Sequence, residues 1–399
     1  MTPEASPFTP GQPVPVEYFV GRRSEVQRLR GLVRGAVGGR FKIGFVTGER
    51  GIGKSSLASF VRHLCEREEK IAGAHVFLGG VADLGEAVRR TFDRLLKESI
   101  EKPWHKKMLE VFGRHVRQIG LFGISLELSL GEADLKSAVH EFIPTLRRIV
   151  SKLNDDRAAI LLILDDINGL ANSAEFSNWL KSTVDEIATS NGRVPVCMLI
   201  VGLEERRQTL VSHQPSLARV FDLIEIRPWS SAESRQFFEQ AFSLAGIKVD
   251  DEALAIMVRF AGGLPVLAHE IGDAVWRTSR PPRVTAEDAM NGVLGAAEVI
   301  GSKLLEPQVF QAIRSQRYRS ILRKLAEKPF EFAFRRADVR ERLAADGTRV
   351  LDNFLTRMKQ LGAIVSDAEA GRGYYRFANQ LHYLYFWIES QRARRERVS

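Results

Sequence analysis

The sequence predicts an α/β fold, with a doubly wound parallel sheet in its first part, a helical region after it and a smaller C-terminal domain. Three observations indicate this fold. Apolar runs of strand length alternate with segments of helical spacing, one such run leads into a glycine-rich loop, and another ends in two adjacent carboxylates. At 399 residues the chain is long enough for two or three domains, each with its own core.

The glycine-rich loop follows the apolar run at residues 41–47, and helical spacing begins at Ser55. Glycines let backbone amides point into one cavity, and the start of a helix adds unpaired N–H donors, so this order suits a phosphate group. We expect Lys54 to reach the β- and γ-phosphates of a bound nucleotide, and the Ser55 hydroxyl to bind Mg²⁺. The loop matches the P-loop motif, and its predicted nucleotide-binding residues are Gly48, Gly51, Ile52, Gly53, Lys54, Ser55 and Ser56.

Two carboxylates, Asp165 and Asp166, follow the apolar run at residues 159–164. An uninterrupted apolar run is typical of a strand covered on both faces, and parallel sheets bind ligands at the carboxyl ends of their strands. We therefore expect Asp165 to help hold Mg²⁺, and Asp166 to be the catalytic residue that polarises the attacking water. The alternative for either acid is a cap on the turn that follows.

The composition, 44% hydrophobic and 27% charged, is typical of a soluble globular protein. No apolar run approaches 18 residues, and the proline-rich N-terminus lacks the basic and apolar blocks of a signal peptide. These features predict a cytoplasmic protein without a membrane partner. Cys65 and Cys197 have neither metal nor redox spacing, so we expect both in the core.

The net charge of +9 comes from the C-terminal part of the chain. Residues 311–399 contain 19 lysines and arginines against 10 acidic residues, whereas residues 1–310 contain 39 of each. This part is therefore a candidate anion-binding module, and double-stranded DNA is the first large anion to consider in a cytoplasm. The alternative is a solvated, arginine-rich surface.

The other predicted elements follow from apolar spacing. A helix at residues 24–37, with Ser24 as its N-cap, precedes the loop strand. Residues 124–130 alternate apolar and polar positions, which predicts a local hairpin arm, with an oligomer contact as the alternative. Further strands are expected at residues 74–78, 196–201 and 223–226, helices at 84–97 and 132–153, and an all-helical region at 232–299.

In the basic module, three helices followed by a glycine-tipped hairpin predict a winged helix. The apolar stripe of the third helix and an aromatic cluster near the C-terminus are assigned to core packing. The helices are expected at residues 309–327, 336–344 and 348–361, and the hairpin strands at 363–365 and 374–377. The residues expected to contact DNA, on the exposed side of the third helix and at the hairpin tip, are Arg349, Asn353, Arg357, Lys359 and Arg372.

Three further motifs occur around these elements: Phe19-Val20-Gly21-Arg22 with Glu25, residues 216–221 (SLARVF) followed by 226–229 (IRPW), and Gly262-Gly263-Leu264-Pro265. They resemble the opening box, the segment between the fourth and fifth strands, and the GGxP turn of the helical lid in AAA+ and STAND-class P-loop ATPases. The resemblance is strongest to the branch with archaeal-type and origin-recognition ATPases, and it covers residues 17 to about 280.

The resemblance implies an ATP hydrolase and gives roles to the matching positions only. Val20, Gly21 and Arg22 would border the adenine, and Pro265 would face the base from the lid. Arg219 occupies the place from which related ATPases offer a catalytic arginine to a neighbour's γ-phosphate, which implies a homo-oligomer. Pairing of Arg219 with the nearby Asp222 at a helix end is the alternative.

Two departures from the family pattern favour slow hydrolysis. Many AAA+ proteins have a glutamate after the strand aspartate, whereas Asp166 is one methylene shorter and would lie farther from its water. The fourth strand ends in residues 201–203 (VGL), where a polar sensor residue is common, and Glu204 or Arg206 could substitute for it. His269 is near the sensor position of some relatives, but we expect it to be structural.

These inferences divide the chain into an arm at residues 1–16, a P-loop ATPase domain at 17–230, a helical lid at 231–304 and a basic winged-helix domain at 305–399. The expected function is a slow ATP-dependent switch that assembles into oligomers and acts on DNA. The alternative is a STAND-type signalling or scaffolding ATPase, whose winged helix is an internal clamp and whose partner is another protein. A GTPase is excluded because no Asn-Lys-x-Asp base reader occurs.

Overall fold

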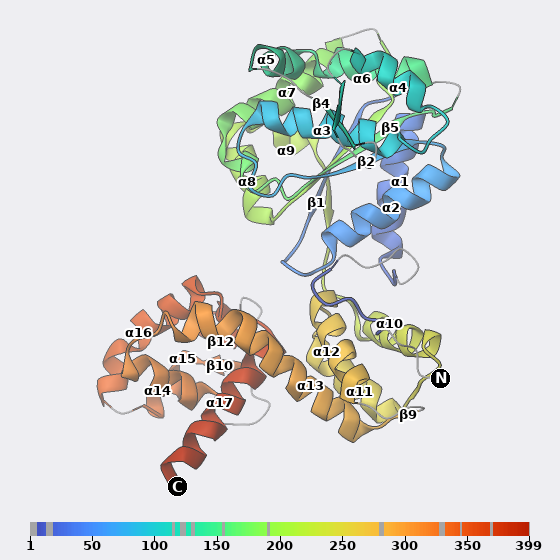
Figure 1. The fold of residues 1–399 in the computed structure, drawn as a ribbon. Coiled ribbons are helices and arrows are strands. Elements are labelled where there is room, and N and C mark those ends of the chain that lie inside the picture. Colours follow the sequence, from blue (N-terminus) through green and yellow to red (C-terminus); the bar gives the residue numbers. More distant parts are fainter. Residues whose placement is uncertain are drawn as a thin grey trace. The chain divides into compact units, whose positions relative to one another are not determined.

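The computed structural model describes residues 6–12, 19–113, 116–119, 125–128, 132–153, 156–189, 192–278, 283–326, 332–343, 345–367 and 370–398. The chain divides into two compact units, and Figure 1 labels most of their elements. The sheet unit is Pro13–Arg227, and the helical unit combines Met1–Gln12 with Pro228–Ser399. Residues 6–12 therefore belong with the C-terminal half of the chain.

A five-stranded parallel sheet forms the centre of the sheet unit, and helices pack around it (Figure 1). The strand order is β2-β5-β6-β1-β7, so the connections from β1 to β2 and from β6 to β7 pass over other strands, as expected for a doubly wound fold. Every residue of β5 and β6 is buried, which explains why both are continuous apolar runs in the sequence. The strands are β1 (Lys42–Thr47), β2 (Ala72–Phe77), β5 (Ile160–Asp165), β6 (Val196–Val201) and β7 (Asp222–Glu225).

The helices of the sheet unit connect these strands. A short antiparallel hairpin of β3 (Val116–Ile119) and β4 (Ser125–Leu128) lies where a hairpin arm was predicted, although positions 124, 129 and 130 of that arm are outside the described residues. The helices are α1 (Arg23–Val37), α2 (Lys54–Glu68), α3 (Leu84–Ser99), α4 (His105–Phe112), α5 (Glu132–His140), α6 (Phe142–Leu153), η3 (Leu170–Asn172), α7 (Ala174–Thr189), α8 (Glu204–His213) and α9 (Leu217–Val220).

The helical unit begins with a bundle in which two helices carry a complete capping box. Ser230 and Glu233 cap α10, and Thr285 and Asp288 cap α13, so each pair satisfies N–H groups that the helix start leaves unpaired. The elements are α10 (Ser231–Leu244), β8 (Lys248–Val249), α11 (Asp251–Ala261), α12 (Pro265–Thr278), β9 (Arg283–Val284), α13 (Ala286–Ile300) and the π-helical segment η4 (Gly301–Phe310).

The C-terminal part of the helical unit combines helices with a three-stranded antiparallel sheet of order β10-β12-β11. The predicted apolar stripe of α16 is buried, as are Tyr383, Tyr385 and Phe386 of α17, so core packing is confirmed for these residues. The elements are α14 (Gln316–Leu325), β10 (Ala333–Arg335), α15 (Arg336–Glu341), α16 (Ala345–Gln360), β11 (Ile364–Ser366), β12 (Tyr374–Phe377) and α17 (Gln380–Val398).

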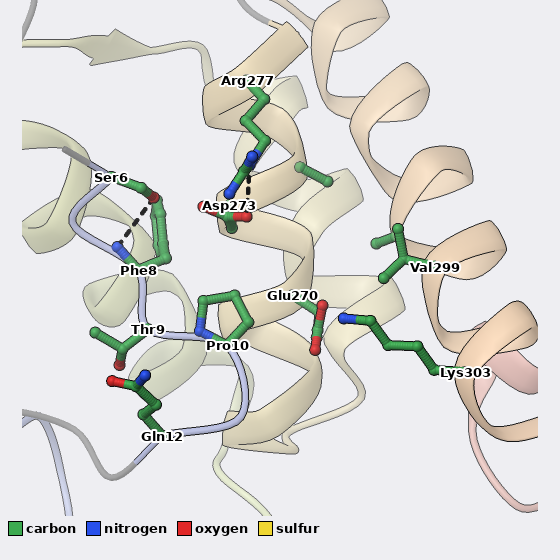
Figure 2. A pocket seen from close by; sticks show the side chains of 12 residues that line it. Ser6, Phe8, Thr9, Pro10, Gln12, Glu270, Asp273, Arg277, Val299 and Lys303 are labelled. Atoms are coloured by element: carbon green, nitrogen blue, oxygen red, sulfur yellow. Dashed lines mark hydrogen bonds and ion pairs between the residues drawn. The ribbon is translucent and has the colours of Figure 1, made fainter. Parts of the chain in front are cut away.

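The N-terminal segment at residues 6–12 lies against α10 and α12 of the helical unit. Phe8 is only 3% exposed, and its ring contacts those of Phe237, Phe242 and His269. The Thr9 backbone N–H donates a hydrogen bond of 3.1 Å to His269 Nδ1. Figure 2 shows the segment bordering a cavity of about 670 Å³, also lined by charged residues of α12 and by Lys303. Residues 6–12 of the predicted arm are therefore packed against α10 and α12.

Several predicted element bounds are wrong for physical reasons. Ser24 does not cap α1, which begins at Arg23, and its hydroxyl donates to Glu25 instead. The helix expected at residues 132–153 is two helices that meet at Glu141, just before Pro144, whose ring disfavours helix through the preceding turn. The helix expected from residue 309 begins at Gln316 as α14. Strands β8 and β9 interrupt the region expected to be all-helical, and β10 was not predicted.

Candidate active site

The predicted P-loop connects the end of β1 to the start of α2. Gly48, Gly51 and Gly53 have positive φ angles of 151°, 75° and 92°, a backbone that side chains disfavour. A Cβ at Gly48 would lie 2.7 Å from the Ile226 carbonyl oxygen, so the loop also needs glycine there for space. The resulting cradle opens at the carboxyl end of the sheet, where parallel α/β folds bind ligands.

The Lys54 ammonium lies in this loop and donates hydrogen bonds to the carbonyl oxygens of Gly48, at 2.9 Å, and Glu49, at 2.7 Å. Burial lowers the pKa of Lys54, while the nearby Asp165 and Asp166 carboxylates act to raise it. The structure thus brings together the lysine and the two acids that the sequence predicted. Phosphate oxygens would replace the two carbonyls as stronger, charged acceptors.

The two adjacent acids have different surroundings. Asp165 ends β5 with only 3% of its surface exposed, and its Oδ2 lies 2.8 Å from Nε2 of His75 on β2. Asp166 is exposed and has a left-handed backbone with φ 58°, and it accepts a hydrogen bond from the Asn168 side chain. A Cβ at Gly79 would lie 2.7 Å from Asp166 Oδ2, so the glycine leaves room for this carboxylate.

The residues present fit a magnesium ion bound with a nucleotide. Within the described residues no group of three or more His, Cys, Asp or Glu side chains could hold a metal by itself. Magnesium at nucleotide sites needs only one or two protein oxygens, because phosphates and water complete its shell. The Ser55 hydroxyl at the start of α2 and the Asp165 carboxylate are the oxygens at this site.

The segment before α1 packs onto the P-loop. Phe19 stacks on Phe60 of α2, with ring centroids 4.3 Å apart, and Val20 is buried. Arg22 has a left-handed backbone, and its buried guanidinium donates to the carbonyl oxygens of Ile52, at 3.2 Å, and Arg227. Arg22 therefore ties the P-loop to the end of the sheet unit. The adenine contacts expected for Val20, Gly21 and Arg22 stay a prediction.

The sensor candidates lie at the start of α8. Glu204 accepts hydrogen bonds of 2.5 to 3.1 Å from the Arg207 guanidinium, which holds the pKa of Glu204 below its usual range. Arg206 donates to the Asn172 side chain at 2.7 Å. Arg219 is exposed on α9, and among the described residues it makes no ion pair with Asp222, the partner considered in the alternative interpretation.

Pro265 belongs to the helical unit, where it is the buried first residue of α12. The turn before it is closed by a hydrogen bond of 2.8 Å from the Trp229 N–H to the Gly263 carbonyl. His269, one turn along α12, is 4% exposed, and burial lowers its pKa to about 4. A buried histidine bonded to the N-terminal segment is structural, as expected.

The five predicted DNA contacts, Arg349, Asn353, Arg357, Lys359 and Arg372, are all exposed in the helical unit. A pocket of about 640 Å³ lies between α14 and α16. Arg357 and Asn353 line it from α16, and Arg314 and Arg317 line it from the α14 side. The Lys359 ammonium lies 5.9 Å from the ring centre of Tyr375, which places it beside β12.

Sequence analysis did not single out His75, Gly79, Asn168 or Phe8. His75 belongs to no motif, and its importance depends on the register of β2 against β5, in which Phe77 lies opposite Asp165. A histidine inside an apolar strand, two residues before the carboxyl edge of a sheet, is the one signal that could have identified it.

Comparison with known proteins agrees with this geometry. Residues 18–199 match the AAA ATPase domain family, whereas a comparison with curated proteins gives no match. The Walker-type ATPase PABY2304 of Pyrococcus abyssi is 17% identical over 93% of this chain and 96% of its own, with a TM-score of 0.56. The Aeropyrum pernix ORC2 protein, solved as ADPNP and ADP complexes, is 15% identical over 98% and 97%, with the same TM-score.

These likenesses show the fold of the whole chain. None of the helices in the described residues combines the length and apolar composition needed to cross a membrane. The family match covers the P-loop, His75 and both aspartates, and it ends within β6. Residues 18–199 are therefore similar to the AAA ATPase domain family, and the protein is an ATP hydrolase with an α/β P-loop ATPase fold.

Proposed function

We propose that the protein is a slow, Mg²⁺-dependent ATPase that works as a nucleotide-controlled switch on double-stranded DNA, which it binds through a C-terminal winged helix. The observation that carries the DNA assignment is the basic pocket between α14 and α16. Three arginines line it, and none of the described residues that line it is acidic. Arginine and lysine make most contacts with DNA phosphates, and these contacts supply affinity without sequence preference.

The exposed face of α16 supports a recognition helix. Arg349 and Asn353 are four residues apart and therefore follow one face, from which base edges could be reached. Arg357 borders the α14 pocket, and Lys359 borders β12, so cations flank this polar face on both sides. The order of helices and strands from α14 to β12, with Arg372 exposed at the hairpin tip, fits a winged helix.

In the nucleotide site each residue has one role. Lys54 would exchange its two carbonyl partners for the β- and γ-phosphates, and Ser55 and Asp165 would hold Mg²⁺. A bound magnesium ion would screen the charge that develops on these phosphates. Asp166, held by its left-handed backbone beyond the end of β5, would orient the attacking water. Its short side chain favours slow turnover.

Assembly is part of the proposal. Arg219 is exposed on α9, so its guanidinium can meet the γ-phosphate held by a second copy of the chain. An arginine supplied in this way stabilises transition-state charge and accelerates hydrolysis by about 10³ to 10⁵ in related phosphoryl-transfer enzymes. The rate of ATP hydrolysis is therefore expected to increase more than in proportion to the protein concentration.

A second candidate function is a signalling or scaffolding ATPase whose winged helix is an internal clamp. One observation favours it: the Gln380 side chain, at the start of α17, lies directly against Gly262 in the turn before α12. The C-terminal region therefore contacts the turn that carries Pro265, within the same unit. A clamp of this kind would transmit the nucleotide state without DNA.

A salt titration of duplex DNA binding separates the two candidates. Replacement of Arg349, Arg357, Lys359 and Arg372 by alanine should weaken binding and flatten its dependence on salt, because removal of each cation from a DNA phosphate reduces the log–log slope by about 0.9. ATP binding should be unchanged. The matched control removes four exposed cations outside this surface: Arg67, Lys106, Lys136 and Lys248. Equal slopes for the two variants would move the assignment to the clamp.

A further inference from the structure

We infer that His75 is a positioning residue for ATP hydrolysis, which holds the Asp165 carboxylate in the orientation needed to bind Mg²⁺. The inference deepens the proposed function and rests on the magnesium role proposed there for Asp165. Its basis is one hydrogen bond between two buried side chains of the sheet unit: His75 Nε2 lies 2.8 Å from Asp165 Oδ2.

The sheet register brings the two residues together. β2 and β5 are parallel neighbours, with Phe77 opposite Asp165 and His75 opposite Ile163. Side chains two residues apart on a strand share a face, so His75 and Phe77 lie on the face of the sheet to which Asp165 also belongs. The imidazole therefore approaches the carboxylate diagonally across two adjacent strands, from the side away from β6.

The two oxygens of the Asp165 carboxylate have different roles in this pair. An ionised carboxylate only accepts hydrogen bonds. The ring nitrogen Nε2 must therefore carry a hydrogen and donate a hydrogen bond to Oδ2. Among the described residues Oδ1 accepts no hydrogen bond, which leaves it for the metal or for a water on the metal. One oxygen is thereby fixed by the protein, and the other would be left for the metal.

Burial makes this hydrogen bond hard to replace. His75 is 4% exposed and Asp165 3%, so water cannot readily take over from the imidazole if the side chain is removed. The imidazole itself is held by Phe77, whose ring stacks on it with centroids 4.4 Å apart and planes 19° apart. Phe77 is 54% exposed and covers the histidine at the strand end.

A hydrogen-bond donor beside the Asp165 carboxylate is expected to increase the affinity for Mg²⁺. Groups that hydrogen-bond a metal ligand fix its orientation, and their removal typically costs ten- to a hundredfold in metal affinity or activity. A histidine with a purely structural role would change stability and leave the metal dependence alone. The two roles therefore differ in a measurable quantity, the Mg²⁺ concentration at which ATP binding reaches half of its metal-dependent gain.

The test compares donor-keeping and donor-lacking variants by equilibrium dialysis of ATP across a Mg²⁺ titration. His75→Gln keeps an amide donor close to the position of Nε2, whereas the side chains of His75→Asn and His75→Leu cannot reach Oδ2. We expect the half-saturating Mg²⁺ concentration to rise about ten- to a hundredfold in the Asn and Leu variants. It should stay within about threefold of the parent in the Gln variant, and metal-free ATP affinity should not change in any of them.

A double variant checks that His75 acts through Asp165. If it does, His75→Asn combined with Asp165→Asn should bind Mg²⁺·ATP no more weakly than Asp165→Asn alone, because the two changes remove one interaction. Equal half-saturation in the parent, Gln and Asn proteins would overturn the inference, as would additive losses in the double variant. A parent protein whose ATP binding ignores Mg²⁺ would instead contradict the proposed magnesium site itself.

Discussion

Replacement of Lys54 by alanine should remove most of the ATP affinity. The ammonium already donates to the carbonyls of Gly48 and Glu49 at 2.9 and 2.7 Å, so nucleotide binding exchanges two neutral acceptors for charged phosphate oxygens. Hydrogen bonds to charged groups are worth about 1.5 to 3 kcal/mol, and the exchange limits the net gain to about that of one such bond. The expected loss is therefore roughly ten- to a hundredfold in affinity.

The Lys54 ammonium also predicts the direction in which ATP affinity changes with pH. Burial lowers the pKa of Lys54, so its ammonium loses the proton at a lower pH than an ordinary lysine does. Affinity of the parent for ATP should be full below this lowered pKa and fall as the pH rises through it. The alanine variant has no ammonium to lose, and its affinity should lack this alkaline fall.

Equilibrium dialysis of ATP over a pH series measures both effects. The matched control is Lys42→Ala, which removes a lysine at the opposite end of the same strand, β1. The control should bind ATP like the parent. The reasoning is refuted if Lys54→Ala also binds with parental affinity, or if it keeps the alkaline fall, because the phosphates would then be held by other groups.

Three further predictions concern single positions. Asp166→Asn should leave ATP binding intact and slow hydrolysis measured by phosphate release, and hydrolysis at the parental rate would show that another group orients the water. Phe8→Ala should lower the free energy of unfolding by about 3 kcal/mol in urea titrations, because it empties a buried aromatic site, whereas Gln12→Ala at an exposed position of the same segment should change little. The pKa of His269 is about 4, below its usual 6.5, so stability is full above about pH 6.5 and should fall toward pH 4, by up to about 3 kcal/mol. His269→Gln should reduce this acid loss, and an unchanged pH profile would contradict it.

The geometry of the candidate nucleotide site could be predicted largely from sequence, because its parts are local. Lys54 and Ser55 are fixed by a loop between a strand and a helix, and the loop glycines have no other good explanation. Asp165 ends the most apolar run in this region, and parallel sheets direct such ends to one edge. The residue types of the loop and the apolar periodicity of the strands therefore place the candidate site at the same edge of the sheet.

The remainder depends on contacts that no local pattern contains. The bond between His75 and Asp165 follows from strand register, which periodicity does not determine. Phe8 packs against an aromatic cluster that lies more than 220 residues later in the sequence. No local pattern in the proline-rich segment indicates this contact, so the segment was predicted to be an arm. The helix boundary at Glu141 was missed because apolar spacing continues across it.

The central claim is that nucleotide state controls DNA binding, and one comparison tests it most directly. Duplex DNA affinity should be measured for the Asp166→Asn protein, which holds ATP without turnover, with saturating Mg²⁺·ATP and without nucleotide, at one fixed salt concentration. Coupling free energies between sites are typically 1 to 3 kcal/mol, so the account predicts that the two affinities differ by about five- to 150-fold. Equal DNA affinities in the two states, or no salt-dependent DNA binding in either, would contradict it.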